Sequence, residues 1–403
     1  MSFLPPKGTD DHLAPESQVW RKALGLWEKW SERYGYPLVM TPIFESADLF
    51  ERGVGDATEV VTKQMYTFDD RGGRSVTLRP EGTAPVVRAY LNSGHQGVWK
   101  GAYSGPYFRY ERPQAGRRRQ FWQVGVEYLD AEAPAADAEV IELGFRYLTD
   151  LGVPQLEVLI NSLGDPTCRP AYVKVLQGYL REKSDLLGPE AKSLIDRNPL
   201  RVLDSKADRD VLMDPPRMVD HLCEPCVDHY LNVKGALNDL GVPYVEDDRL
   251  VRGLDYYTRT TFEFIGGDLE ASQNAVGGGG RYDGLAETIG GRAVPGVGFA
   301  LGMDRIILSL GESESTHIDA YLVSETGSRD ALRVASQLRG DGVRVDFDTE
   351  DRSVKAQFRS ARRLEAPVVL VWKGIDQPVD IQTEKGRAER PLREVSDWFR
   401  ANR

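Results

Sequence analysis

Apolar side chains recur every three or four residues near the start of the chain. Between residues 15 and 34 they include Trp20, Leu24 and Trp27, and Gly35 follows directly. Apolar residues at this period predict an amphipathic helix, and a glycine commonly lies just beyond a helix end. The chain is therefore expected to begin with one helix that ends before Gly35.

Pairs of β-rich runs separated by polar turns dominate the next part of the chain. The runs 63–68 and 75–80 flank the turn "DDRGGR", and the runs 105–111 and 119–129 flank an arginine-rich loop. Each pair predicts an antiparallel β-hairpin. Residues 81–92, between the hairpins, predict a helix whose leading acid suits the positive end of the helix dipole.

Further strands are expected before and after these hairpins. Residues 36–44 predict a strand interrupted by Pro42, residues 251–266 predict another, and residues 295–310 begin as a strand and end as an apolar helix. The stretch "GGGGRYDGL" (277–285) fits either a close backbone approach to a ligand or a flexible turn.

Two segments differ in pattern from this antiparallel part. Residues from about 165 to 245 predict a helical insertion, and the polar stretch 311–316 predicts a connector. Beyond it, strand-like and helical runs alternate, which predicts a small α/β domain with a mostly parallel sheet. We therefore expect an α+β core on an antiparallel sheet over residues 1–312, and an α/β domain over residues 317–403.

Composition narrows the class of protein. The chain has 403 residues, 41% of them hydrophobic and 28% charged, which is typical of a globular protein with two or three domains. We find no apolar run long enough to span a bilayer and no secretory signal at the N-terminus. Its three cysteines favour a reducing compartment, so we expect a cytoplasmic protein.

Positive charge is concentrated in two stretches of this acidic chain. The formal net charge is −11, so a polyanionic partner must be met by local basic patches. The stretch "FRYERPQAGRRRQFWQ" (108–123) concentrates five arginines, and "DRSVKAQFRSARR" (351–363) predicts a basic helix face. A solvated loop and a solvated helix are the alternative interpretations.

Several motif-based functions are excluded or disfavoured. His221, Cys223, Cys226 and His229 resemble a zinc site, but ligands spaced along one expected helix point in different directions, so we expect no metal there. The glycines of residues 296–302 do not match a dinucleotide fingerprint, and a GK[ST] phosphate loop is absent. No histidine lies beside a plausible serine or cysteine nucleophile.

Six segments in one order carry a more specific signal. Together they resemble the histidyl-tRNA synthetases, a class II aminoacyl-tRNA synthetase family, over nearly the whole chain. The segments are "YGYPLVMTPIFE" (34–45), "LRPEGTAPVVRAY" (78–90), "GPYFRYERPQAGRRRQFWQVGVEYLD" (105–130), "LVRGLDYYTRT" (250–260), "GGGGRYDGL" (277–285) and "VPGVGFALGMDRI" (294–306).

The resemblance implies an ATP-dependent ligase of protein biosynthesis. Such an enzyme activates L-histidine with ATP to histidyl-adenylate and transfers it to tRNA-His, releasing AMP and diphosphate. Residues 1–312 would then be the class II catalytic domain and residues 317–403 an anticodon-binding domain. Mg²⁺ is expected with the ATP phosphates, and a homodimer is expected from the first motif around Pro42.

The resemblance also assigns site residues. We expect Arg109 and Arg252 to be catalytic, because fixed guanidiniums hold a carboxylate and a phosphate together. The expected histidine-binding residues are Glu81, Thr83, Arg109, Gln123, Glu127, Arg252, Tyr256 and Tyr257. The expected ATP-binding residues are Arg109, Glu111, Arg117, Phe121 and Arg305, and the expected tRNA-binding residues are Gln114 and Arg119.

Elementary chemistry supports the assignment of Glu127 and Tyr257 to the imidazole. A neutral imidazole has one donor and one acceptor nitrogen, which Glu127 and Tyr257 would match. Arg109 is expected within a strand, and the loop residues Gln114, Arg118 and Arg119 are expected to be free to meet tRNA.

The chain departs from the family in two places. Trp122 lies where the family often carries histidine, and the last forty residues match only loosely. Two alternatives remain: a non-catalytic regulatory relative of ATP phosphoribosyltransferase, and an adenylating enzyme outside translation.

Overall fold

The computed structural model describes residues 3–55, 58–205, 207–267, 274–311 and 318–402. The chain divides into two compact units, Met1–Asp11 with Trp20–Gly311, and His12–Val19 with Glu312–Arg403. The expected connector at 311–316 lies outside the described residues except for Gly311.

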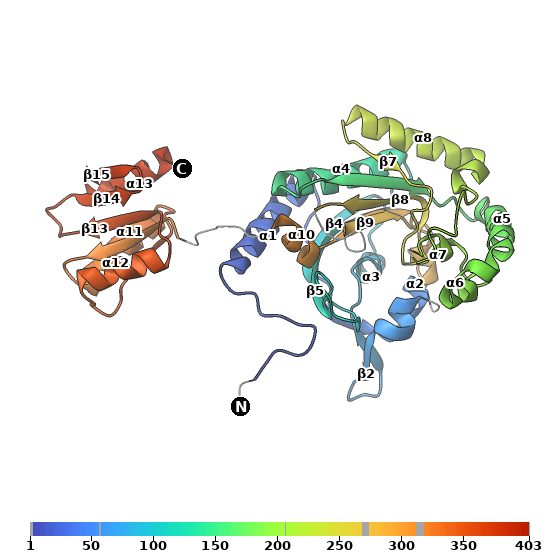
Figure 1. The fold of residues 1–403 in the computed structure, drawn as a ribbon, viewed down its shortest axis with the longest axis horizontal. Coiled ribbons are helices and arrows are strands. Elements are labelled where there is room, and N and C mark those ends of the chain that lie inside the picture. The colour runs from blue at the N-terminus through green and yellow to red at the C-terminus, as the bar shows by residue number, and fades with distance from the viewer. Residues whose placement is uncertain (1–2, 56–57, 206, 268–273, 312–317, 403) are drawn as a thin grey trace. The chain divides into compact units, whose positions relative to one another are not determined.

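A seven-stranded sheet lies at the centre of the first unit (Figure 1). Its strand order is β4-β5-β10-β9-β8-β6-β7, and every neighbouring pair is antiparallel except β6 with β7. This confirms the predicted antiparallel sheet. The strands are β4 Trp99–Phe108, β5 Gln120–Leu129, β6 Glu157–Ser162, β7 Val245–Glu246, β8 Thr258–Ile265, β9 Ala275–Arg281 and β10 Gly296–Gly302.

The glycine run lies in the middle of this sheet. Residues 277–280 belong to β9, between β8 and β10, so the flexible-turn interpretation is wrong. A side chain at Gly279 would collide with the carbonyl oxygen of Gly298 on β10. At Gly278 it would press on the guanidinium of Arg252, so the strand must be bare on both faces.

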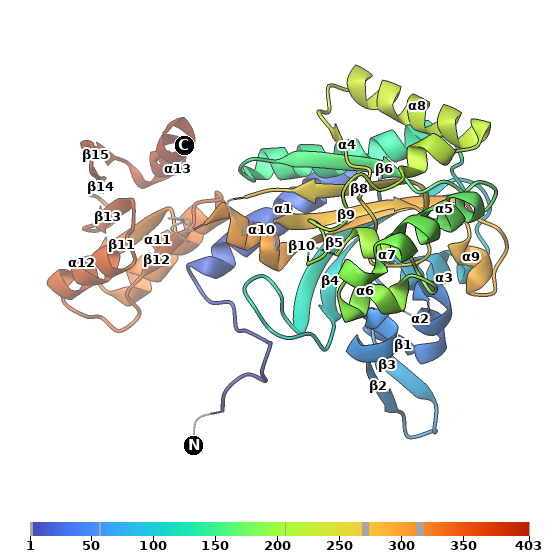
Figure 2. The same ribbon diagram turned by 45° about the vertical axis from the view of Figure 1, so that its right-hand side comes forward.

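Helices cover the sheet and carry its loops. Helix α4 (Pro134–Leu151) runs along one face, and α8 (Glu224–Asp239) lies outside it (Figures 1 and 2). The other helical elements of this part are α1 Glu16–Arg33, α2 Ala47–Val54, η1 Val60–Gln64, α3 Thr83–Ser93, α9 Leu285–Thr288 and α10 Met303–Leu310. The predicted helices at 15–34 and 81–92 are thus confirmed as α1 and α3.

The first predicted hairpin is confirmed, whereas the strand before it is mostly wrong. β2 (Tyr66–Asp69) pairs antiparallel with β3 (Ser75–Leu78), and β1 (Phe44–Ser46) adds to β3. Of residues 36–44, only Leu38 makes an isolated bridge, and only Phe44 lies in a strand.

Between β6 and β7 every element among the described residues is helical. These are α5 Arg169–Glu182, η2 Ser184–Leu186, α6 Pro189–Leu194, α7 Leu200–Leu203, η3 Met218–His221 and α8. Tyr172, Leu176 and Leu180 follow one another along one face of α5 and are buried in a shared apolar cluster. Within the described residues, no helix is both long and apolar enough to cross a membrane.

The second unit has a five-stranded sheet with order β12-β11-β13-β14-β15. β11 pairs in parallel with β12 and β13, whereas β14 and β15 are antiparallel. The prediction of a mostly parallel sheet therefore holds only for the first three strands. The elements are β11 Ala320–Ser324, α11 Ser328–Gly340, β12 Val345–Phe347, α12 Val354–Arg363, β13 Val368–Trp372, β14 Val379–Thr383, β15 Gly386–Arg390 and α13 Leu392–Ala401.

Candidate active site

A cavity of about 390 Å³ opens on the sheet of the first unit. It is lined by residues from β5, β8, β9 and β10 and from the segments that lead into them. Most of the predicted site residues lie on its wall: Glu81, Thr83, Arg109, Glu111, Arg117, Phe121, Gln123, Arg252, Tyr256, Tyr257 and Arg305. Glu81 and Arg305, 224 residues apart along the chain, are thus brought to one place.

Arg109 is held rigidly, although not within a strand. β4 ends at Phe108, so the prediction that Arg109 lies on a strand is wrong by one residue. Its backbone N–H donates to the carbonyl oxygen of Arg119 at 2.9 Å, which continues the pairing of the hairpin. Its Nε donates to the carbonyl oxygen of Pro80 at 2.8 Å, and its guanidinium lies 5.4 Å from the ring centre of Phe121. Burial lowers the pKa of Arg109.

Arg252 enters the cavity from the segment before β8. Its Nη1 donates to Oε1 of Glu263 on β8 at 2.5 Å. Burial acts to lower the pKa of Arg252, but the Glu263 carboxylate outweighs it and raises that pKa. Among the described residues, Arg252 Nε and Gln123 Oε1 are buried without a hydrogen-bond partner. Buried polar atoms are nearly always paired, so these two atoms are suited to bind a ligand.

Arg305, on α10, supports the arginine-rich loop. Its Nη1 donates to the carbonyl oxygen of Ala275 at 2.7 Å, and its side chain packs against Gly116 in the loop. The neighbouring Asp304 accepts the backbone N–H of Trp122 at 3.0 Å. α10 therefore fixes both the loop and β5. Burial lowers the pKa of Arg305, and the nearby charge of Arg117 adds to that effect.

Two buried carboxylates lie near the cavity, Glu81 on its wall and Glu127 behind it. Glu127, on β5, is fully buried and accepts hydrogen bonds from the hydroxyls of Tyr103, at 3.3 Å, and Tyr282. Burial raises the pKa of Glu127 to about 8, although the Tyr282 hydroxyl acts to lower it. Glu81 accepts the backbone N–H groups of Thr83 and Ala84, at 2.7 and 2.9 Å, at the start of α3.

Two tyrosines, Tyr256 and Tyr257, also line the cavity. The rings of Tyr256 and Tyr257 lie 4.6 Å apart, and Tyr256 also meets the edge of Tyr282. Unlike Tyr257, Glu127 is not on the cavity wall; it lies in the layer behind. The predicted pairing of Glu127 with Tyr257 around an imidazole stays a prediction.

Two sequence-family models match the chain and identify its family. The sequence model for "Histidyl-tRNA synthetase" matches residues 8–306, and that for "Anticodon binding domain" matches residues 312–372. The chain belongs to the histidyl-tRNA synthetase family. The class II core and the anticodon-binding domain expected from the sequence are thereby confirmed.

Individual relatives and solved structures support the same family assignment. The histidine–tRNA ligase of Halothermothrix orenii is 45% identical over 92% of this chain and 91% of its own. That of Nocardia farcinica is 46% identical over 98% and 96%. The crystal structure of apo Staphylococcus aureus histidyl-tRNA synthetase is 34% identical, with a TM-score of 0.77 over 99% of this chain and 100% of that one. A Bacillus halodurans structure named as an ATP phosphoribosyltransferase regulatory subunit/histidyl-tRNA synthetase shares the fold, at 22% identity and a TM-score of 0.68 over 93% and 99%.

The predicted tRNA-binding residues lie outside the cavity wall of this synthetase-family chain. Gln114 is exposed at the loop tip, where its backbone exchanges hydrogen bonds with Arg117. The expectation of a free loop is wrong for its last residues: Arg118 pairs with Asp10 at 2.5 Å, and the Arg119 guanidinium lies 3.8 Å from the centre of the Tyr110 ring. The N-terminal segment therefore holds one side of the loop.

Sequence reasoning missed Glu263, Tyr103 and Tyr282. Glu263 lies between Phe262 and Phe264 on β8, and a charged residue flanked by two buried aromatic residues is a usable signal for a partly buried charge with a function. Tyr282 lies two residues after the last glycine of the run, but nothing in its own stretch indicates Glu127, which is 155 residues away.

The two histidines of the stretch 221–229 lie away from its two cysteines. His229 bonds Asp137 on α4 at 3.2 Å, and His221 lies against the ring of Tyr172, so its two histidines do not converge with its two cysteines.

Proposed function

We propose that the cavity joins L-histidine to ATP and passes the histidyl group to tRNA-His, releasing AMP and diphosphate. Family membership makes the chain a histidine–tRNA ligase, an ATP-dependent aminoacyl-tRNA synthetase of protein biosynthesis. One observation supports the mechanism: Arg109, Arg252 and Arg305 line a single cavity together with the buried carboxylate of Glu81.

Adenylate formation brings two anions together, so their repulsion must be overcome. Arg252 is suited to this because Glu263 holds one end of its guanidinium and its buried Nε is left for the ligand. The proposed role of Arg252 is to bridge the histidine carboxylate and the α-phosphate, and that of Arg109 is to bind the α-phosphate. Guanidiniums bind such oxygens bidentately and keep their charge when buried.

The remaining ATP contacts lie toward the loop. Arg305 and Arg117 would hold the γ-phosphate, and Phe121 would stack on adenine. Glu111 is a carboxylate on the cavity wall that can hold Mg²⁺, which would screen charge between the phosphates. The domain assignment 1–312 and 317–403 is part of the same proposal.

Histidine would lie beside the buried Glu81. Glu81, Thr83 and Gln123 would hold its ammonium group, which suits the buried Gln123 Oε1 that lacks a partner among the described residues. Glu127 and Tyr257 would bind the imidazole, with Tyr256 closing the pocket. A site of this kind rejects an analogue without the ring nitrogens by about 10⁴-fold.

Gln114 and Arg119, in the arginine-rich loop between β4 and β5, would contact tRNA. A homodimer is supported by exposed apolar side chains around the first motif: Leu38, Met40, Ile43, Phe44 and Phe68. Exposed apolar patches of this kind commonly mark an interface. Three free cysteines support work in the reducing cytoplasm.

Two assays test the proposal. Purified protein should exchange pyrophosphate into ATP only when histidine is present, and should charge tRNA-His but not a version that lacks its additional 5′ guanosine. Exchange with another amino acid would overturn the pocket assignment, and exchange without charging would favour an adenylating enzyme outside translation. A protein that catalyses neither exchange nor charging would instead be a regulatory protein.

A further inference from the structure

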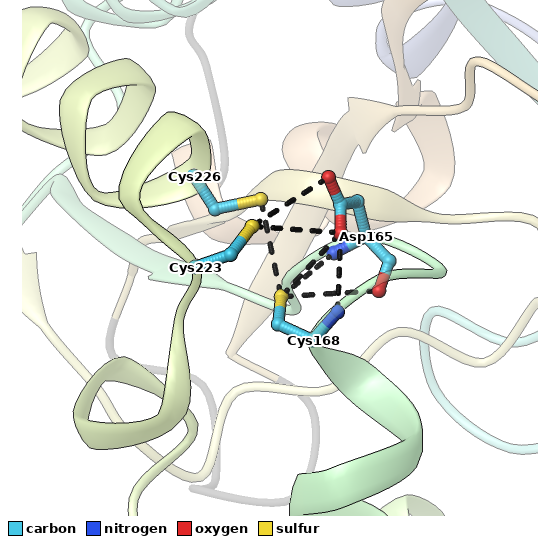
Figure 3. Close-up of side chains that lie close together, drawn as sticks. All are labelled: Asp165, Cys168, Cys223 and Cys226. Atoms are coloured by element: carbon cyan, nitrogen blue, oxygen red, sulfur yellow. Dashed lines mark hydrogen bonds between the residues drawn. The ribbon is translucent and has the colours of Figure 1, made fainter.

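All three cysteines of the chain gather around one carboxylate (Figure 3). Asp165 and Cys168 lie in the turn that leads into α5, Cys223 precedes α8, and Cys226 is in the first turn of α8. The three sulfur atoms and the carboxylate point toward one another, and their candidate ligand atoms all lie within 4.8 Å of each other. Two short segments 58 residues apart are thus joined at one point.

The distances match the edges of a zinc tetrahedron. Cys168 Sγ lies 4.0 Å from Cys226 Sγ and 3.5 Å from Asp165 Oδ1, and Cys223 Sγ lies 3.7 Å from the same oxygen. With Zn–S bonds of about 2.3 Å and Zn–O bonds of about 2.1 Å, a tetrahedral site has edges of about 3.8 Å between sulfurs and about 3.6 Å between sulfur and oxygen. A disulfide would need sulfurs about 2.05 Å apart, and all three thiols are free.

The surroundings also suit a metal ion. Cys168 and Cys226 are buried in an apolar cluster with Tyr172 and Met218, and the partly buried Asp165 carboxylate lies beside it, 3.5 Å from Cys168 Sγ, where a cation would compensate its charge. The backbone N–H groups of Thr167 and Cys168 bond Asp165 Oδ1, at 2.9 and 3.3 Å, and the Asp165 N–H lies 3.4 Å from Cys168 Sγ. Hydrogen bonds of this kind orient metal ligands.

A cation outside the cluster offsets its remaining charge. Three thiolates and a carboxylate around Zn²⁺ leave a net negative charge, and Arg259 Nη2 lies 3.6 Å from Asp165 Oδ2. The ligands form two pairs, Asp-x₂-Cys and Cys-x₂-Cys, which is the paired arrangement of structural zinc sites.

We propose that Asp165, Cys168, Cys223 and Cys226 bind one Zn²⁺ as a structural site. Four protein ligands fill a tetrahedron, so the ion does not take part in the reaction. This replaces the expectation of no metal in the stretch 221–229. That expectation considered only ligands within the stretch, whereas the second pair lies 58 residues earlier.

The site would connect the helical segment to the histidine pocket. The Leu163 backbone N–H donates to the carbonyl oxygen of Arg259, and the Arg259 N–H donates to the carbonyl oxygen of Gly164, both at 2.7 Å. In addition, Arg169 Nη2 donates to the carbonyl oxygen of Tyr257 at 2.6 Å. These contacts are within a few residues of Asp165 and Cys168. The ion would therefore hold α5 and α8 against the backbone that carries Tyr256 and Tyr257.

Metal analysis of the full chain, purified without a polyhistidine tag from zinc-supplemented cells, tests the proposal. We expect one zinc per chain, three thiols that react with a mercurial as that zinc is released, and visible bands of tetrahedral thiolate-bound cobalt when Co²⁺ replaces it. Protein without zinc, with three freely reactive thiols and no cobalt bands, would overturn the site, as would a disulfide detected between any two cysteines. These measurements do not depend on any variant folding.

Variants then identify the ligands. Cys223→Ser, the least buried cysteine, should lose zinc, lower the melting temperature and raise the KM for histidine more than it lowers kcat. Asp165→Asn should weaken zinc binding less than loss of a thiolate does. His221→Ala is the matched control, because it lies in the same stretch but outside the four ligands, and it should keep its zinc. Equal zinc in Cys223→Ser and wild type would show an adventitious ion only.

Discussion

At the scale of single residues, the site depends on groups that hold other groups. Arg252 faces the ligand, but Glu263 fixes its direction and supports its charge. Tyr103 and Tyr282 do the same for Glu127. These supporting residues are absent from the sequence-based assignment, because a resemblance marks the groups that touch substrate and the fold alone reveals their partners.

Replacing Glu263 should impair catalysis without removing any substrate contact. In Glu263→Gln the guanidinium of Arg252 loses a charged partner worth about 1.5–3 kcal/mol, so kcat/KM for pyrophosphate exchange should fall by about tenfold to a hundredfold. Glu59→Gln, another carboxylate on the cavity wall, is the control and should remain near wild type. An unchanged rate in Glu263→Gln would show that Arg252 needs no positioning.

The raised pKa of Glu127 predicts the pH dependence of histidine use. The free imidazole loses its proton near pH 6.5. Glu127, whose pKa is about 8, stays largely protonated below pH 8. If ionised Glu127 binds neutral imidazole, both protons must leave, so kcat/KM for histidine should rise with pH and level off above about 8. In Glu127→Gln the inflection near 8 should vanish while that of the imidazole stays. A wild-type profile that is flat above the imidazole inflection would contradict this role.

At the scale of elements, local patterns predicted most of the fold correctly. Hairpins and amphipathic helices depend on nearby residues, so β2–β3, β4–β5, α1 and α3 were predictable. Residues 36–44 have the composition of a strand, yet they lack a partner strand over most of their length. β14 alternates apolar and polar residues (VDIQT), a usable signal that was overlooked because the strand is only five residues long. β15 has one apolar residue among glycine and charged residues, so it lacks the alternation that marks a strand.

A buried ion pair that joins three elements was equally invisible in the sequence. Asp137 on α4 and Arg281 at the end of β9 are fully buried and paired, and His229 on α8 also bonds Asp137. Burial acts to raise the pKa of Asp137, but Arg281 and His229 outweigh it and lower that pKa. The pair thus fastens both outer helices to the glycine-rich strand behind the site.

Asp137→Asn should therefore destabilise the first unit strongly. It leaves Arg281 buried without its counter-charge, which typically costs about 3–5 kcal/mol in the free energy of unfolding. Asp150→Asn is the control on the same helix: Asp150 accepts the Trp30 Nε1–H at an exposed position, so the change should stay within about 0.5 kcal/mol. Denaturant unfolding measures both, and equal values would show that the buried pair is dispensable.

At the scale of the whole molecule, the net charge of −11 makes any tRNA contact a local matter. Helix α12 offers such a contact in the second unit, since Lys355, Arg359 and Arg362 are all exposed on it at helical spacing. The anticodon-binding match covers this helix. Sequence alone left a solvated helix face as the alternative, because charge spacing is the same in both cases.

Replacing Lys355, Arg359 and Arg362 with alanine separates these alternatives. If the three side chains bind phosphates, the KM for tRNA in the charging assay should rise, and the dependence of log KM on log salt should flatten by about two units, at about 0.7 per phosphate of a single strand. Histidine-dependent pyrophosphate exchange should not change, because it requires no tRNA. Lys385, Arg387 and Arg390, equally exposed around β15, form the matched triple control. Equal effects of the two triple variants would mean that the unit attracts tRNA by its overall charge, and that α12 makes no specific phosphate contact.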